Sequence, residues 1–196
     1  EPADDSTATP PPAINGAHVG CQQDIVNQVI KLLQKRDERP RQLVITGKAG
    51  VGKSFVCRMI AWHLGCHYLS TPAPPNPLVL FIPLQQVPFE NQKTQEFDWE
   101  RLWQWWLKRS ETLSPELNCD RNWLEETLLK KPTTLILDGL DDFLSNHANL
   151  GIAQIQTLLH LFNQRYAHNN QLTVIISLRS STHGLERLAR SRDDIF

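Results

Sequence analysis

The stretch Gly47-Lys48-Ala49-Gly50-Val51-Gly52-Lys53-Ser54 fits the pattern G-x-x-x-x-G-K-[ST] of a phosphate-binding loop. An apolar run before it, Leu43–Thr46, predicts a strand, and Phe55–Leu64 after it predicts a helix. Glycines let the backbone point consecutive N–H groups inward, and the helix N-terminus adds positive partial charge. The loop therefore predicts a nucleotide site in which Lys53 reaches the β- and γ-phosphates and the Ser54 hydroxyl ligates Mg²⁺. We expect nucleotide contacts from the loop and the next residue, namely Gly47, Lys48, Ala49, Gly50, Val51, Gly52, Lys53, Ser54 and Phe55.

Composition and charge limit the classes of protein that fit. The 196 residues suffice for one domain with a full core, and a formal net charge of −1 gives no indication of nucleic acid as a partner. No apolar run approaches the length of a membrane span, and no signal-peptide pattern is present. The four cysteines are scattered without a C-x-x-C pair, as expected of reduced thiols. We therefore expect a cytoplasmic protein.

The chain divides into a short tail and one domain. Residues 1–17 are rich in Pro, Ala, Ser, Thr and Asp, a composition that predicts a flexible linker or tail. Residues 18–196 are predicted to form a single nucleotide-binding domain. The chain begins at Glu1 and stops at Phe196 after a charged stretch, so we expect a fragment of a longer protein.

Strands and helices alternate along the domain. Continuous apolar runs predict three further buried strands, at Leu78–Ile82, Thr133–Leu137 and Leu172–Ser177. Helical spacing predicts helices at Gln22–Lys35, Trp99–Lys108, Trp123–Lys130 and through residues 152–162. This alternation predicts a parallel α/β sheet with right-handed crossovers. In the second helix, Trp105 lies off the apolar stripe and is a candidate for an exposed contact.

The strand Thr133–Leu137 ends in an acidic block, Asp138-Gly139-Leu140-Asp141-Asp142. Because the carboxyl ends of parallel strands face the crevice that binds ligands, Asp138 is placed to hold Mg²⁺ opposite Ser54, directly or through water. A further carboxylate can orient and deprotonate the attacking water. Either Asp141 or Asp142 could serve, and the residues leave the choice open.

Together, the loop Gly47–Ser54 and the block Leu135–Asp142 resemble the NACHT branch of the STAND signalling ATPases. The small residue after the first Asp, followed by a displaced acidic pair, is the most telling similarity. A GTPase would show N-K-x-D, and a transporter ATPase L-S-G-G-Q; neither string is present. The resemblance implies a P-loop NTPase fold, a three-layer α/β/α sandwich with a mostly parallel central sheet, that binds ATP or ADP with Mg²⁺.

The resemblance also implies roles for particular residues. Arg179, after the fourth predicted strand, would contact the γ-phosphate, so that Lys53, Arg179 and one of the two later acids form the catalytic group. Val19, in the segment His18–Cys21, would pack beside the adenine.

The chain departs from the family's usual pattern at three positions. Asp142 stands where the family usually has Glu, Ser180 where a proline often follows the arginine, and Cys21 where an arginine often follows the glycine. A shorter Asp142 could retract the base from the water and slow hydrolysis. We expect this fragment to lack the lid and winged-helix segments that normally follow the core in the family.

Three functions remain open at this stage. The resemblance implies an ATP/ADP switch with slow hydrolysis, which in the full-length protein self-oligomerises in its ATP state and activates an attached effector under a sensor domain. One alternative is an AAA+ motor or DNA-loader-type ATPase with robust turnover, for which Arg187, Arg190 and Arg192 are arginine-finger candidates. The other is a scaffold that binds nucleotide without hydrolysing it.

Overall fold

The computed structural model describes residues 22–34, 42–70, 78–88, 99–113, 119–146, 152–166, 168–169 and 172–180. Its elements are, in order, α1 (Gln22–Gln34), β1 (Gln42–Gly47), α2 (Lys53–Ser70), β2 (Leu78–Pro83), η1 (Leu84–Gln86), α3 (Trp99–Leu113), α4 (Arg121–Lys130), β3 (Thr133–Asp138), α5 (Leu140–Asn146), α6 (Ile152–Arg165) and β4 (Leu172–Arg179). In this part of the chain, no helix is both long and apolar enough to cross a membrane.

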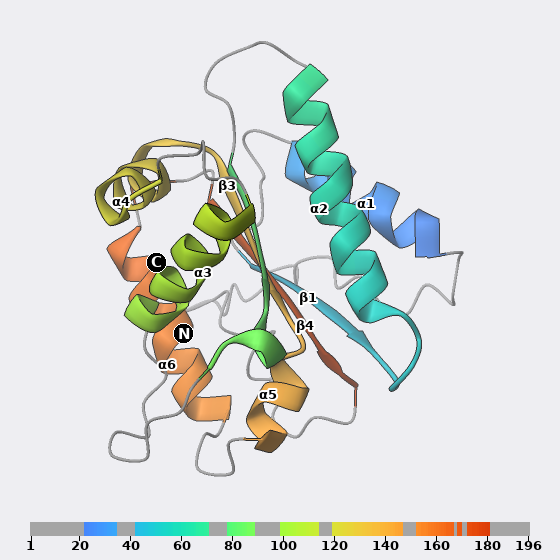
Figure 1. Cartoon of the computed structure of the whole chain (residues 1–196). Coiled ribbons are helices and arrows are strands. Elements are labelled where there is room, and N and C mark those ends of the chain that lie inside the picture. The colour runs from blue at the N-terminus through green and yellow to red at the C-terminus, as the bar shows by residue number, and fades with distance from the viewer. Residues whose placement is uncertain are drawn as a thin grey trace, which may run out of the picture.

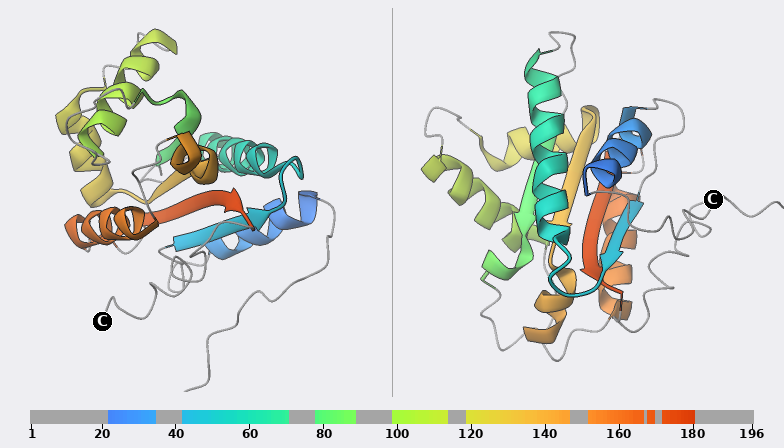
Figure 2. Two further views of the ribbon diagram at one scale, coloured as in Figure 1. Left: turned by 90° about the horizontal axis from the view of Figure 1, so that it is seen from below. Right: turned by 90° about the vertical axis from the view of Figure 1, so that its right-hand side faces the viewer.

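The four strands form one sheet in the order β1-β4-β3-β2, and all of its described pairings are parallel. In the register of the two central strands, Leu135 lies beside Val174 and Leu137 beside Ile176. Helices α1 and α2 cover one face of the sheet, while α3, α4 and α6 lie on the other (Figures 1 and 2). These layers confirm the predicted parallel α/β/α sandwich.

Both faces of the sheet are buried, which explains the unbroken apolar runs of its central strands. Successive side chains of a strand point to opposite faces. Ile136 and Ile175 accordingly pack with α1 and α2, whereas Leu135, Leu137 and Val174 pack with the helices of the opposite face. A strand buried on both sides has no place for alternating polar residues.

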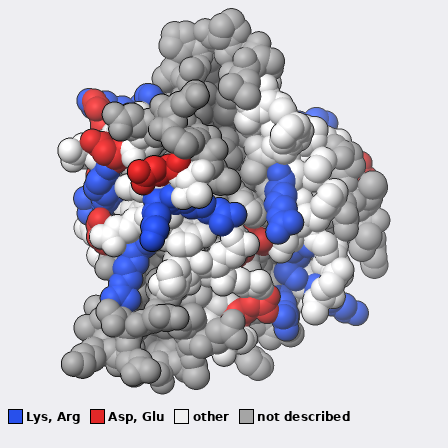
Figure 3. Space-filling model, viewed as in Figure 1, with Lys and Arg blue, Asp and Glu red and all other residues white. Residues whose placement is uncertain are grey.

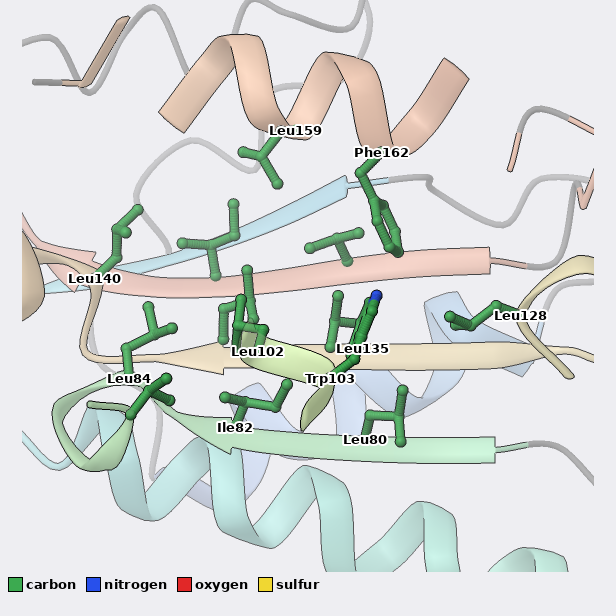
Figure 4. Close-up of a cluster of buried hydrophobic side chains, with 14 of the residues drawn as sticks. Leu80, Ile82, Leu84, Leu102, Trp103, Leu128, Leu135, Leu140, Leu159 and Phe162 are labelled. Atoms are coloured by element: carbon green, nitrogen blue, oxygen red, sulfur yellow. The ribbon is translucent and has the colours of Figure 1, made fainter. Parts of the chain in front are cut away.

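An aromatic cluster forms the centre of the larger core, between the sheet and α3, α4 and α6. Trp103 of α3 is fully buried, and the ring of Trp99 stacks on it with centroids 5.6 Å apart. Phe162 reaches down from α6, its ring centroid 4.5 Å from that of Trp99 and 4.7 Å from that of Tyr166 (Figure 4). This cluster fixes α3 and α6 against the sheet through buried aromatic area.

The structure corrects the expectation for Trp105. Its side chain is half-buried and packs against the edge of the larger core, and the Arg109 guanidinium lies 5.5 Å from its ring centroid. The tryptophan that stands in solvent is Trp62 of α2, which is 68% exposed. Helix α2 presents apolar residues around much of its circumference, so sequence periodicity did not identify its buried side.

Replacing Trp103 by alanine removes a fully buried indole from the larger core. We expect the free energy of unfolding in urea to fall by about 3–5 kcal/mol, because the deletion leaves a cavity that the core closes only in part. Trp62→Ala is the matched control, since the same change at a 68% exposed site should stay within about 0.5 kcal/mol of the parent. Equal losses in the two variants would contradict the assignment of the core.

Candidate functional site

The backbone of the loop between β1 and α2 explains its glycines. Gly50 and Gly52 have φ values of 76° and 88°, in the left-handed region that side chains disfavour. A Cβ on Gly47 would come within 2.8 Å of the Val51 methyl carbon Cγ2. Helix α2 begins directly at Lys53, so the loop lies at the positive end of a helix of 18 residues. Local sterics therefore require glycine at these three positions.

The Lys53 ammonium folds back over this loop. Its Nζ donates to the backbone carbonyls of Gly47 at 3.1 Å and Lys48 at 3.0 Å. The Gly47 carbonyl also accepts from the backbone N–H of Ser180 at 3.1 Å, which ties the loop to the end of β4. The positive charge of Lys53 is thus fixed at the loop itself.

Asp138, the last residue of β3, connects three elements. Its Oδ1 accepts hydrogen bonds from the hydroxyls of Ser54 on α2, at 3.1 Å, and Ser177 on β4, at 2.6 Å. The Ser177 oxygen in turn accepts from the backbone N–H of Gly139 at 2.9 Å. Asp138 is only 5% exposed, and a buried carboxylate requires such donors because it has lost water.

Cys57, one turn into α2, is fully buried near this carboxylate. Burial, reinforced by the nearby Asp138 charge, raises the pKa of the Cys57 thiol to about 12. A hydrogen bond with Ser177 and the Lys53 charge act in the opposite direction and are weaker. The thiol is therefore protonated and acts here as a small apolar side chain.

The two later acids of the block lie in the first turn of α5 and share one arginine. Arg179, at the end of β4, pairs through Nε with the Asp141 oxygen Oδ2 at 2.7 Å and through Nη2 with Asp142. The second carboxylate oxygen of Asp142 accepts from the Gln85 side-chain amide at 2.6 Å. Gly139, with φ of 80°, makes the turn from β3 into α5 that brings the acids to this position.

These groups surround one open pocket of about 260 Å³ at the carboxyl ends of the strands. Of the predicted site residues, the structure brings Ala49, Gly50, Gly52, Lys53, Ser54, Asp141, Asp142 and Arg179 to its walls, joined by Gly139 and Ser177. Asp138 lies just behind them through its bond to Ser54. Val51, inside the loop, and Phe55, directly after it, are 48% and 54% exposed.

Some predicted residues lie outside the described part of the chain, and two side chains of the site, Ser177 and Gln85, were not predicted. Val19 and the three finger candidates Arg187, Arg190 and Arg192 lie outside the described residues. Ser177 could have been found as the one small hydroxyl near the end of an apolar strand. Gln85 carries no sequence signal, because its meeting with Asp142 depends on β2 lying beside β3.

The donor set fits a nucleotide with Mg²⁺. The Ser54 hydroxyl and the Asp138 carboxylate are hard oxygen ligands of the kind that Mg²⁺ prefers. Within the described ranges, no group of three or more His, Cys, Asp and Glu could hold a metal by itself. Magnesium usually takes only one or two protein ligands and completes its shell with waters and phosphate oxygens. Lys53 and Arg179, both in the lining of the pocket, supply positive charge for the phosphates.

A glycine loop at a helix N-terminus, facing an acid-ended strand across one intervening strand, defines a nucleotide-binding P-loop NTPase. A family model described as the NACHT domain matches residues 41–193, and the chain belongs to this family.

Nine chains among the solved structures also match. One is domain III of the replication initiation protein DnaA from Thermotoga maritima, with 18% identity and a TM-score of 0.43, over 90% of this chain and 58% of that chain. No curated protein matches.

Lys53→Ala should abolish binding of ATP, because it removes the ammonium that the loop holds at the pocket. Calorimetric titration of Mg-ATP should show at least about a hundredfold loss of affinity, or about 2.7 kcal/mol. Lys130→Ala, an equal loss of charge on the exposed face of α4, is the control and should titrate like the parent. An unchanged ATP affinity in Lys53→Ala would contradict the position of the site.

Alkylation of Cys57 reports on the integrity of the site. Its raised pKa keeps the thiol protonated at pH 8, and its side chain is fully buried. Iodoacetamide should therefore modify the exposed Cys66 first, and Cys57 only when the domain opens. Mg-ATP should slow the Cys57 reaction further, because a ligand of the folded state stabilises it. Equal rates at the two thiols, read by peptide mass spectrometry, would contradict this geometry.

Proposed function

We propose that this domain is an ATP/ADP switch, which hydrolyses ATP slowly with Mg²⁺ and controls the oligomerisation and activation of an attached effector in its parent protein. The observation that carries the proposal is the pairing of Arg179 with both Asp141 and Asp142 at the wall of the P-loop pocket. The scattered cysteines support a cytoplasmic location.

A switch requires a group that interacts differently with ATP and ADP, since a nucleotide shifts an equilibrium only by its difference in affinity. Arg179 meets this requirement on two grounds. Its side chain is 44% exposed at the pocket, and its planar guanidinium suits phosphate oxygens. The γ-phosphate of ATP would compete with the two carboxylates for Arg179, and ADP, lacking that group, would leave the ion pairs in place.

The same ion pairs account for slow hydrolysis. In the resting arrangement, Asp142 receives Arg179 on one oxygen and Gln85 on the other, and Asp141 also binds Arg179. Neither carboxylate is then free to orient the attacking water. Either acid becomes available as a base only when Arg179 turns to the γ-phosphate.

The remaining residues of the chain bind and orient the phosphates. The loop N–H groups and Lys53 would hold the β- and γ-phosphates, while Ser54 and Asp138 would hold the metal ion. Magnesium, when bound, would neutralise the charge that develops on the transferred phosphoryl group. The near-complete burial of Asp138 keeps its carboxylate in one orientation.

The nucleotide retained by the purified protein tests the proposal most simply. Mass spectrometry of the nucleotide released on denaturation should find ADP, and phosphate release with excess Mg-ATP should be slow. Brisk turnover that rises on assembly or with DNA would favour a motor or loader ATPase instead. Bound nucleotide with no phosphate release on any timescale would favour a scaffold.

Arg179→Ala should remove the preference between ATP and ADP. We expect affinity for a non-hydrolysable ATP analogue to fall about tenfold or more, with ADP affinity changed several-fold at most, because only the analogue carries a γ-phosphate. Arg165→Ala is the control, since Arg165 is an exposed arginine of α6 that pairs with Glu125. An equal loss for both nucleotides would contradict the sensor role.

Asparagine substitutions test which of the two acids, Asp141 or Asp142, is the base. Asp141→Asn and Asp142→Asn preserve shape but remove the charge of a base, so the variant that loses the base should bind ATP and retain it unhydrolysed. Single-turnover phosphate release, measured alongside ATP binding, distinguishes them. The acid whose substitution leaves hydrolysis intact is not the base, and intact hydrolysis in both variants would exclude the pair.

A further inference from the structure

A groove on the outer side of α3 lies apart from the nucleotide pocket. Its volume is about 570 Å³, and the described residues that line it on α3 are Arg101, Gln104, Trp105, Lys108, Arg109 and Thr112. Their spacing of three, four and seven residues places them on one continuous helix face. Pro88, which follows β2, lines the groove from another segment. The opposite face of α3, with Leu102 and Trp103, packs into the larger core.

Positive charge dominates the described lining of this groove. Lys and Arg side chains gather over α3 in the view of Figure 3, and the described lining contains no acidic residue. Lys108 and Arg109 form no ion pair with any residue in the described part of the chain. Glu111, the nearest acid along α3, is exposed but is not part of the lining.

Two basic residues of the neighbouring helix α4 are paired with acids. Arg121 pairs with Glu100 at 2.9 Å and with Glu125 at 2.8 Å, and Lys130 pairs with Glu126 at 2.6 Å. Lys108 and Arg109 therefore differ from these paired residues, in a chain whose formal net charge is −1.

Arg109 is held in position before any ligand arrives. Its guanidinium lies over the ring of Trp105, 5.5 Å from the centroid, and Trp105 is itself half-buried against the core. Such a cation–π contact contributes about 0.5–1 kcal/mol at an exposed site and limits the rotamers of the arginine. A ligand that binds Arg109 then pays less entropy than it would at a mobile side chain.

We propose that this groove binds an acidic segment of a partner polypeptide, with Lys108 and Arg109 as its anchors. Charge complementarity supports the choice of an acidic ligand. A peptide is favoured over a single-stranded nucleic acid because bases bind such grooves by stacking on aromatic faces, and Arg109 already covers the face of Trp105.

The two anchors set the spacing of the acids. Lys108 and Arg109 are neighbours on α3, so the two carboxylates of the ligand must lie on one face of the bound segment. Side chains of an extended peptide alternate between its two faces. The partner segment should therefore be extended and carry two Asp or Glu residues with one residue between them.

Fluorescence anisotropy with the whole chain tests the proposal. The probe is a short fluorescein-labelled peptide that carries two glutamates with one residue between them, compared with the same peptide carrying glutamines. We expect the glutamate peptide alone to bind, more weakly as salt rises, because salt screens exposed charges. Lys108→Gln combined with Arg109→Gln should weaken binding about tenfold or more. Arg109→Lys, which keeps the charge but loses the planar stack, should weaken it several-fold.

The matched control is Lys31→Gln combined with Lys130→Gln, which removes the same charge from α1 and α4 and should bind the peptide like the parent. Unchanged Mg-ATP affinity in the groove variant shows that the domain is folded and that the groove is separate from the nucleotide site. The proposal is overturned if neither peptide binds, if both bind equally, or if the two double variants weaken binding equally. Tighter binding of a labelled oligothymidylate than of the acidic peptide also overturns it.

Discussion

The buried carboxylate of Asp138 is the constraint on which the rest of the site depends. It ends β3 inside the fold, where an ionised group is tolerated only with hydrogen-bond donors around it. Those donors come from Ser54 at the start of α2 and Ser177 near the end of β4. Satisfying one charge thus fixes the phosphate loop, the acidic strand and the strand between them in a single arrangement.

The position of Asp141 and Asp142 follows from the same group of hydrogen bonds around Asp138. Gly139 turns the chain directly after Asp138, and its N–H bonds to Ser177, so the first turn of α5 is held against β4. Asp141 and Asp142 therefore meet Arg179, which ends β4. An arginine that two carboxylates and a phosphate can share is a simple physical basis for a nucleotide-dependent switch.

Local patterns predicted much of this structure, and tertiary contacts supplied the rest. The loop glycines and the four strands were predictable because backbone sterics and two-sided burial leave direct marks in the sequence. The strand order could not be predicted from the sequence. The contacts of Ser177 and Gln85 could not be predicted either, because they depend on which strands are neighbours. Trp105 was misjudged because its place beside the apolar stripe of α3 still lets it pack on the core edge.

Hydrogen exchange of the backbone amides of α5 tests the central claim most directly. The domain is compared by mass spectrometry with Mg-ADP and with the magnesium complex of a non-hydrolysable ATP analogue. If the γ-phosphate draws Arg179 away from Asp141 and Asp142, α5 loses its tie to β4 and its amides exchange faster with the analogue than with ADP. Identical exchange in the two complexes would contradict the account.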